Sequence, residues 1–290
     1  MKHAGEIFRK IREERGFTLE QVAKGVCRHQ TVANFEEKAS NLGYRSFYGI
    51  LKNVGVSLEE FWYEMNRYKL DTFDSLIQKA NILYDANDII ALKGLLKNEE
   101  ARKQNLEYRH DLTCLMIKSM IGRMDSTVVL NDAEKNKIVD YLGMTEHWGF
   151  YELTLFSTTI ESFSNATLKK LSKYFISRSE FYSEIPKNKN MIALTLLNLM
   201  GRLTYYDEYT FASDLSKRIQ GLLEEKDIFH RTIFLYNTGV LEVSMDNMAG
   251  LKKMQDAIYV FELVESKQLA KTYQVNYDHI KDELTKKGKI

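Results

Sequence analysis

The sequence predicts an all-α protein with a small N-terminal domain, residues 1–66, and a larger domain of helical repeats, residues 67–290. Three features lead to this prediction. The 290-residue chain contains one proline, Pro186, and 15 glycines, so few positions oppose a helix. Its 44% apolar residues suffice for two buried cores. Those apolar residues also recur at helical spacing along the whole chain.

The first helix is expected over residues 4–15. Ile7, Phe8 and Ile11 fall on one face at the three-to-four spacing of an amphipathic helix. Gly16 can adopt the left-handed conformation that ends a helix, so the chain should turn there.

The second helix is expected to begin at Leu19. Thr18 stands where an N-cap is needed, and Gln21 lies three residues later, which together form a capping box. Val22 and Ala23 should then point inward. Because Ala23 is small, the next helix can approach closely.

The third helix is expected from His29 to Glu37. Val32 and Phe35 form its buried side. Its opposite side carries the polar residues Gln30, Thr31 and Asn34 and can therefore form hydrogen bonds with a partner.

Two more short helices complete the N-terminal domain. One is expected over residues 45–52, where Phe47, Ile50 and Leu51 share a face. The other contains Leu58, Phe61 and Trp62, and Ser57 is placed to cap it.

Residues 18–62, TLEQVAKGVCRHQTVANFEEKASNLGYRSFYGILKNVGVSLEEFW, resemble the lambda-repressor-like, XRE-type helix-turn-helix domain. In such domains the third helix enters the major groove of double-stranded DNA, and side chains near its N-terminus reach base edges. The resemblance assigns base contacts to Arg28, His29, Gln30, Thr31 and Asn34. It assigns phosphate contacts to Arg12, Arg15, Gln21 and Arg45.

The charge distribution agrees with a nucleic-acid partner. Residues 1–58 contain ten Lys and Arg against six Asp and Glu, although the whole chain has a net charge of only +1. A modestly basic domain suits a polyanion. The alternative is that these arginines are ordinary solvated surface residues.

The remainder of the chain alternates apolar clusters with short polar breaks, the rhythm of stacked helix hairpins. We expect a helix over residues 63–71 to join the two domains. The clusters are Leu76–Tyr84, Leu92–Leu96, Leu112–Met120, Ile138–Leu142, Tyr151–Phe163, Leu168–Phe175, Ile192–Leu203, Leu215–Leu223, Ile233–Leu241 and Met254–Leu263.

Residues 148–156, WGFYELTLF, together with the helix-turn-helix head, resemble the Rgg/GadR/MutR group of Gram-positive regulators. The resemblance implies a tetratricopeptide-like C-terminal domain that forms homodimers. It also implies control by a short secreted peptide that is re-imported into the cell, as in quorum sensing. The WGFYELTLF segment itself has its aromatic residues at helical spacing, so we expect it to be packing core.

A peptide held on the concave face of such repeats needs side-chain partners for its backbone, because each unpaired group costs about 1–3 kcal/mol. Asn198 and Asn237 lie inside otherwise apolar stretches, LTLLNLMGRL and TIFLYNTGVL. Arg202 follows Asn198 by one helical turn and can take a carboxylate. We add Tyr205, Arg231 and Tyr236 as further candidates, ahead of Tyr151 and Thr158. The alternative is that each interior Asn bonds a neighbouring helix.

Several function classes lack their motifs. The six histidines show no metal-ligand spacing, and there is no P-loop, dinucleotide-binding glycine motif or nucleophile elbow. We therefore expect no enzyme activity, no cofactor and no metal. Cys27 and Cys114 match neither a disulfide framework nor a metal site, which is typical of a reducing compartment.

No apolar run approaches the length of a membrane span, and the start MKHAGEIFRKIREER is charged. A cytoplasmic protein without a membrane partner is expected. Two other functions stay open. The helical domain of a DNA-binding regulator could serve only for dimerisation or for a non-peptide ligand, or the repeats could hold a protein partner.

Overall fold

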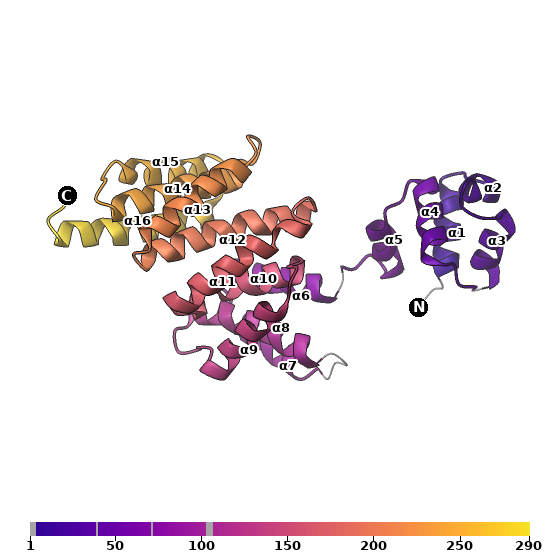
Figure 1. Ribbon diagram of the computed structural model, residues 1–290, viewed down its shortest axis with the longest axis horizontal. Coiled ribbons are helices and arrows are strands. Elements are labelled where there is room, and N and C mark those ends of the chain that lie inside the picture. The colour runs from indigo at the N-terminus through magenta and orange to yellow at the C-terminus, as the bar shows by residue number, and fades with distance from the viewer. Residues whose placement is uncertain (1–3, 39, 71, 103–106) are drawn as a thin grey trace. The chain divides into compact units, whose positions relative to one another are not determined.

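The structure is a computed structural model that describes residues 4–38, 40–70, 72–102 and 107–290. Every regular element in these ranges is a helix, which confirms the all-α class for the described part of the chain. Figure 1 shows the helices in chain order. The chain divides into two compact units, one ending at Ile82 and the other beginning at Leu83.

The first unit contains a compact group of short helices. Its core combines Phe8 of the first helix, Val32 and Phe35 of the third, and Leu51 and Phe61 of the following two. The helices are α1 (Ala4–Glu14), α2 (Leu19–Ala23), α3 (His29–Lys38), α4 (Tyr44–Val54) and α5 (Leu58–Met65).

Local capping chemistry sets where two of these helices begin. The Thr18 hydroxyl accepts from the Gln21 N–H at 3.2 Å, and the Gln21 side chain accepts from the Thr18 N–H at 2.7 Å. Ser57 forms the same reciprocal box with Glu60 before α5. Both N-caps predicted from the sequence are confirmed.

The prediction of a continuous helix over residues 63–71 is wrong. Helix α5 ends at Met65, and Arg67 and Tyr68 adopt φ values of 56° and 60°, in the left-handed region that a right-handed helix cannot contain. The Asn66 amide then donates to the carbonyls of Lys69 and Leu70, which stabilises the turn. Asp71 lies outside the described residues, and α6 begins at Thr72.

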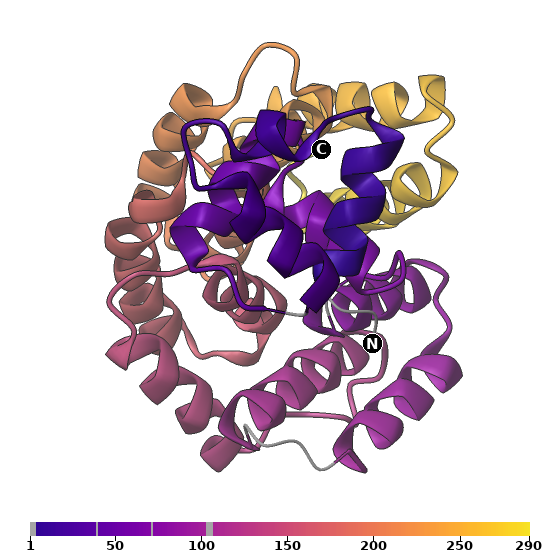
Figure 2. The same cartoon turned by 90° about the vertical axis from the view of Figure 1, so that its right-hand side faces the viewer.

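The second unit is a stack of helix pairs, which confirms the helical-repeat class. Figure 2 shows its helices following one another in a curved array. The helices are α6 (Thr72–Asp85), in which the division between the units falls, α7 (Ile89–Glu100), α8 (Glu107–Met124), α9 (Asp132–Met144), α10 (Phe150–Thr159), α11 (Asn165–Arg178), α12 (Pro186–Tyr205), α13 (Tyr209–Leu222), α14 (Ile228–Ser244), α15 (Gly250–Leu263) and α16 (Lys267–Lys286).

Four of these helices form a row in which each packs on the next: α8, α10, α12 and α14. We call this the central helix row. Helix α13 packs on α12, and α15 packs on α14. Two 3-10 turns, η1 (Ile160–Ser162) and η2 (Glu180–Tyr182), follow α10 and α11. None of the helices in the described ranges combines the length and apolarity needed to cross a membrane.

The aromatic segment at residues 148–156 is packing core, as predicted. Trp148 is fully buried, and its Nε1 donates to the carbonyls of Leu142 and Thr145 at 3.2 Å each. Its ring lies 5.4 Å from that of Phe156 and 6.2 Å from that of Phe175, measured between centroids. These contacts join α9, α10 and α11 around one aromatic cluster.

Both cysteines are free thiols. Cys114 is buried in α8, and burial, helped by nearby carboxylates, raises its pKa to about 12. Cys27 is half-buried, and burial also raises its pKa. Because the thiolate is the reactive form, we expect Ellman's reagent to modify Cys114 of the folded protein much more slowly than Cys27. Reaction of a Cys27→Ser variant at the rate of the native protein would contradict this.

Candidate nucleic-acid interface and central helix row

Helix α3 has one side in the core of the first unit. Val32 and Phe35 are buried, and the Phe35 ring lies 6.1 Å from Phe8 and 5.8 Å from Phe47 between centroids. This packing fixes the rotation of the helix about its axis. Residues on the side of α3 opposite Val32 and Phe35 therefore face away from the core.

The five residues expected to contact bases lie at the N-terminal part of α3, with Arg28 directly before its first residue. Arg28, His29, Gln30 and Thr31 are exposed, and Asn34 is half-buried. The Gln30 amide donates to Asn34 Oδ1 at 3.5 Å. The structure therefore brings all five together at the N-terminal part of α3. Arg28 directly precedes the helix, and the other four lie in its first two turns.

Arg45 lies exposed in the first turn of α4. The N-cap of this helix is Gly43, which has no side chain to accept from the first N–H groups. A helix N-terminus without a side-chain cap attracts anions, and a nearby guanidinium strengthens the attraction. The predicted phosphate contact at Arg45 is compatible with this geometry.

Arg15 and Gln21 are exposed but already bonded within the unit. Arg15 Nη1 donates to the carbonyls of Val54 and Gly55 at 2.8 Å each, where α4 ends. Gln21 Oε1 belongs to the capping box of α2. Both side chains therefore have a structural task independent of DNA.

Arg12 requires a correction, because it is a core residue rather than a surface cation. The residue is 8% exposed, and its Nε and Nη2 donate to the two carboxylate oxygens of Glu36 at 2.7 and 2.8 Å. Its Nη1 donates to the Phe17 carbonyl at 2.9 Å. The hydrogen bonds to Glu36 raise the pKa of Arg12. The side chain ties α1 to α3 and is removed from the phosphate contacts.

In the second unit, the two interior asparagines connect neighbouring members of the central helix row. Asn237 Nδ2 of α14 donates to the Leu197 carbonyl of α12 at 2.9 Å. Asn198 Nδ2 of α12 donates to Ser157 Oγ of α10 at 3.3 Å. A Cβ on Gly201 would lie 3.9 Å from the amide atoms of Asn237, so Gly201 leaves that amide uncrowded.

Arg202 lies on the same helix as Asn198. Its Nη2 donates to the Tyr206 hydroxyl at 3.0 Å and to the Glu161 carbonyl at 3.3 Å. Its guanidinium lies 4.8 Å from the centroid of the Tyr205 ring, a cation–π contact. The Nε atom is buried and has no hydrogen-bond partner among the residues that the structure describes. This N–H is therefore left for an acceptor from outside those residues.

Sequence reasoning missed Arg123, which approaches the end of α10 from α8. Its Nη2 donates to the carbonyls of Ser157 and Thr158 at 3.2 and 3.0 Å, and its Nε lies 3.3 Å from Glu161 Oε1. An arginine at the end of the apolar helix around residues 112–124 was the available signal. Arg123 and Arg202 thus satisfy carbonyl groups near the C-terminal end of α10 from two helices.

Tyr236 also requires a correction. It is 1% exposed, its hydroxyl donates to the Tyr273 carbonyl at 3.0 Å, and its ring lies 4.6 Å from that of Tyr273. The side chain belongs to the core shared by α14, α15 and α16. Tyr205 and Arg231 are exposed, and Arg231 Nη1 donates to the Leu223 carbonyl at 3.5 Å.

A family model described as the HTH-type transcriptional regulator Rgg, C-terminal domain, matches residues 93–275, which is more than half of the chain. This chain belongs to the Rgg family. The family model describes transcription regulators.

Solved structures show the same fold as this Rgg-family chain. The SHP pheromone receptor Rgg2 of Streptococcus dysgalactiae is 22% identical, with a TM-score of 0.79, over 95% of this chain and 99% of that one. PrgX in complex with iCF10 is 10% identical, with a TM-score of 0.71, over 98% of both chains. ComR of S. thermophilus, in complex with DNA and its signalling peptide ComS, is 11% identical, with a TM-score of 0.64, over 96% and 99%.

Proposed function

We propose that this Rgg-family chain is a cytoplasmic, homodimeric DNA-binding regulator controlled by a short signalling peptide on its central helix row. The observation that carries the DNA-binding part is the polar N-terminal part of α3, a helix whose other side is buried in the core. Arg28 lies directly before this helix, and Gln30 and Asn34 lie on its outward side. ComR, which shares the fold, has been solved with both DNA and a peptide.

The side chains of α3 suit the major groove. Gln30 and Asn34 can each bridge N6 and N7 of adenine, and Arg28 can bridge O6 and N7 of guanine. Each good bidentate contact contributes roughly 1–3 kcal/mol of discrimination against the wrong base. Arg45 and the α4 N-terminus add a phosphate contact that fixes the position of α3 without reading sequence.

Replacing Arg28 and Gln30 together by Ala is expected to raise the Kd at least tenfold for duplexes selected by the native protein from a randomised pool. The expectation follows from the loss of two base contacts. Arg9→Ala is the matched control, because Arg9 is an exposed cation of α1 that pairs with Glu13. Circular dichroism checks the fold. Unchanged affinity in the double variant would remove α3 from the interface.

Arg45→Ala is expected to weaken binding to all duplexes alike and to reduce the slope of log Kd against log salt by about 1. Fluorescence anisotropy at several salt concentrations, on a selected and an unselected duplex, measures both effects. Loss of affinity for the selected duplex alone would instead make Arg45 a base-reading residue.

The peptide part rests on the polar groups of the central helix row. Asn198 and Asn237 each donate one hydrogen bond from Nδ2 to a neighbouring helix, and a side-chain amide can form further ones. Within the described part of the chain, the buried Nε of Arg202 has no partner. A peptide that lies across α12 and α14 could pair its backbone with the amides and its carboxylate with Arg202. Bound in this way, it would stabilise one arrangement of the stacked helices over another.

Synthetic eight-residue apolar peptides with a free C-terminal carboxylate test this part, with the Kd for a selected duplex as the readout. We expect some of them to shift that Kd and Arg202→Ala to weaken the effective peptides about tenfold, as loss of a charge-assisted bond implies. Lys173→Ala, on the exposed face of α11, is the control. Intact DNA binding without any response to peptides would favour a repeat domain that only dimerises or takes a different ligand.

A further inference from the structure

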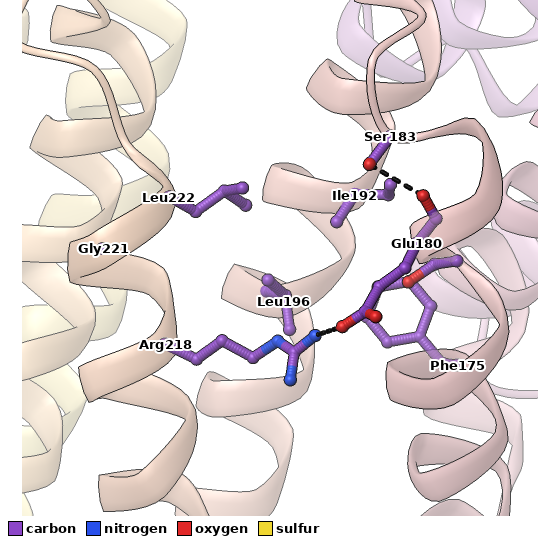
Figure 3. Close-up of a pocket in the computed structure, with 9 residues that line it drawn as sticks. Phe175, Glu180, Ser183, Ile192, Leu196, Arg218, Gly221 and Leu222 are labelled. Atoms are coloured by element: carbon purple, nitrogen blue, oxygen red, sulfur yellow. Dashed lines mark hydrogen bonds and ion pairs between the residues drawn. The ribbon is translucent and has the colours of Figure 1, made fainter.

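The second unit contains a pocket that neither proposed binding surface uses. It lies among α11, η2, α12 and α13 and has a volume of about 410 Å³, within the usual range for small-molecule sites (Figure 3). Ile192 and Leu196 of α12 line it, together with Phe175 of α11 and Leu222 of α13. These four side chains form the apolar part of its lining.

A hydroxyl lines the same pocket. Ser179, directly after the last residue of α11, is 3% exposed and is one of the lining residues. A hydroxyl can donate one hydrogen bond and accept others, so Ser179 can donate to a ligand atom that enters the pocket.

A charged pair lies beside the apolar residues. Arg218 of α13 donates from Nη2 to Glu180 Oε1 at 2.5 Å, as Figure 3 shows. The Glu180 side chain is 67% exposed, against 42% for Arg218. Glu180 can therefore turn into solvent more easily than Arg218, which leaves the guanidinium fork facing the pocket.

We propose that this pocket binds a small monocarboxylate with an unbranched apolar tail. The carboxylate replaces Glu180 on Arg218 and accepts from the Ser179 hydroxyl, while the tail packs on Phe175, Ile192 and Leu196. The four apolar residues favour a hydrocarbon chain, and the guanidinium selects an anionic head group. The site is independent of the peptide proposal, because Asn198 and Arg202 do not line it.

Isothermal titration calorimetry of the full chain with octanoate tests the proposal, with octan-1-ol as the uncharged probe. We expect one octanoate per chain, bound at least tenfold more tightly than octan-1-ol. Arg218→Gln should weaken octanoate binding at least tenfold, whereas Glu180→Gln should tighten it, because the competing carboxylate is lost. Equal affinity for the two probes, or no effect of either variant, would overturn the assignment.

A pair of glycine variants separates occupancy of the pocket from a general change in the protein. A Cβ on Gly221, which lines the pocket, would meet no atom within 4 Å, and the same is true of Gly94 in α7. Both Gly221→Trp and Gly94→Trp should therefore fold. We expect octanoate binding to be lost only in Gly221→Trp. Full binding in that variant, or loss in both, would place the ligand elsewhere and refute the proposal.

Discussion

Replacing Arg12 by Met is expected to destabilise the first unit by about 3–5 kcal/mol, the usual cost of removing one partner from a buried ion pair. Glu36 is almost fully buried and accepts two hydrogen bonds from Arg12. Without Arg12 its charge has no partner in an apolar core. The same variant leaves the Phe17 carbonyl, which accepts from Arg12 Nη1, without its donor.

The chain provides a spectroscopic reporter for each unit, because its two tryptophans lie one in each. Trp62 in α5 belongs to the first unit and Trp148 to the second. Urea unfolding followed by fluorescence in a Trp148→Phe background therefore measures the first unit alone. The native pair in the same background is the reference.

A double variant separates loss of the pair from loss of packing. Arg12→Met with Glu36→Leu removes both charges at once, so its cost should be clearly smaller than that of Arg12→Met alone. A single variant as stable as the native unit would show that water solvates Glu36. A double variant worse than the sum of both single changes would show that side-chain volume, not charge, dominates at this contact.

The features that the sequence predicted correctly are local in the chain. Thr18 and Gln21 are three residues apart, as are Ser57 and Glu60, so their reciprocal hydrogen bonds need no knowledge of the rest of the fold. The apolar clusters of the second unit are local in the same sense and coincide with helices. Helix α16 was missed because its buried residues, Ala270, Tyr277 and Leu284, form only a narrow stripe on a polar helix.

The features that the sequence did not predict depend on distant partners. Arg12 lies 24 residues from Glu36, and nothing near it in the chain distinguishes it from the exposed Arg9. Tyr236 and Asn237 are adjacent, yet one donates to α16 and the other to α12. Which neighbour each helix face meets is decided by stacking, so partner identity could not be read from helical periodicity.

Gly250→Ala is expected to destabilise the second unit by about 2–3 kcal/mol, a typical cost of overpacking. Helices α14 and α15 cross at Gly239 and Gly250 with their backbones in contact. A Cβ on Gly250 would lie 2.2 Å from the Gly239 carbonyl oxygen, and one on Gly239 would lie 2.5 Å from the Gly250 oxygen. Because these are backbone atoms, only separation of the two helices relieves the clash, and this loosens the packing around Met254 and Ala257.

The same chemical change should have the opposite sign where the helix faces open space. Gly94→Ala is expected to stabilise the second unit by up to about 1 kcal/mol, since Ala favours a helix over Gly and no atom lies within 4 Å of the new Cβ. Urea unfolding in a Trp62→Phe background, followed by Trp148 fluorescence, measures both variants. If Gly250→Ala also stabilised the unit, this result would contradict the close contact between the backbones of α14 and α15 at Gly239 and Gly250. The opposite signs would trace the cost to the crossing itself, because helix propensity favours Ala at both positions.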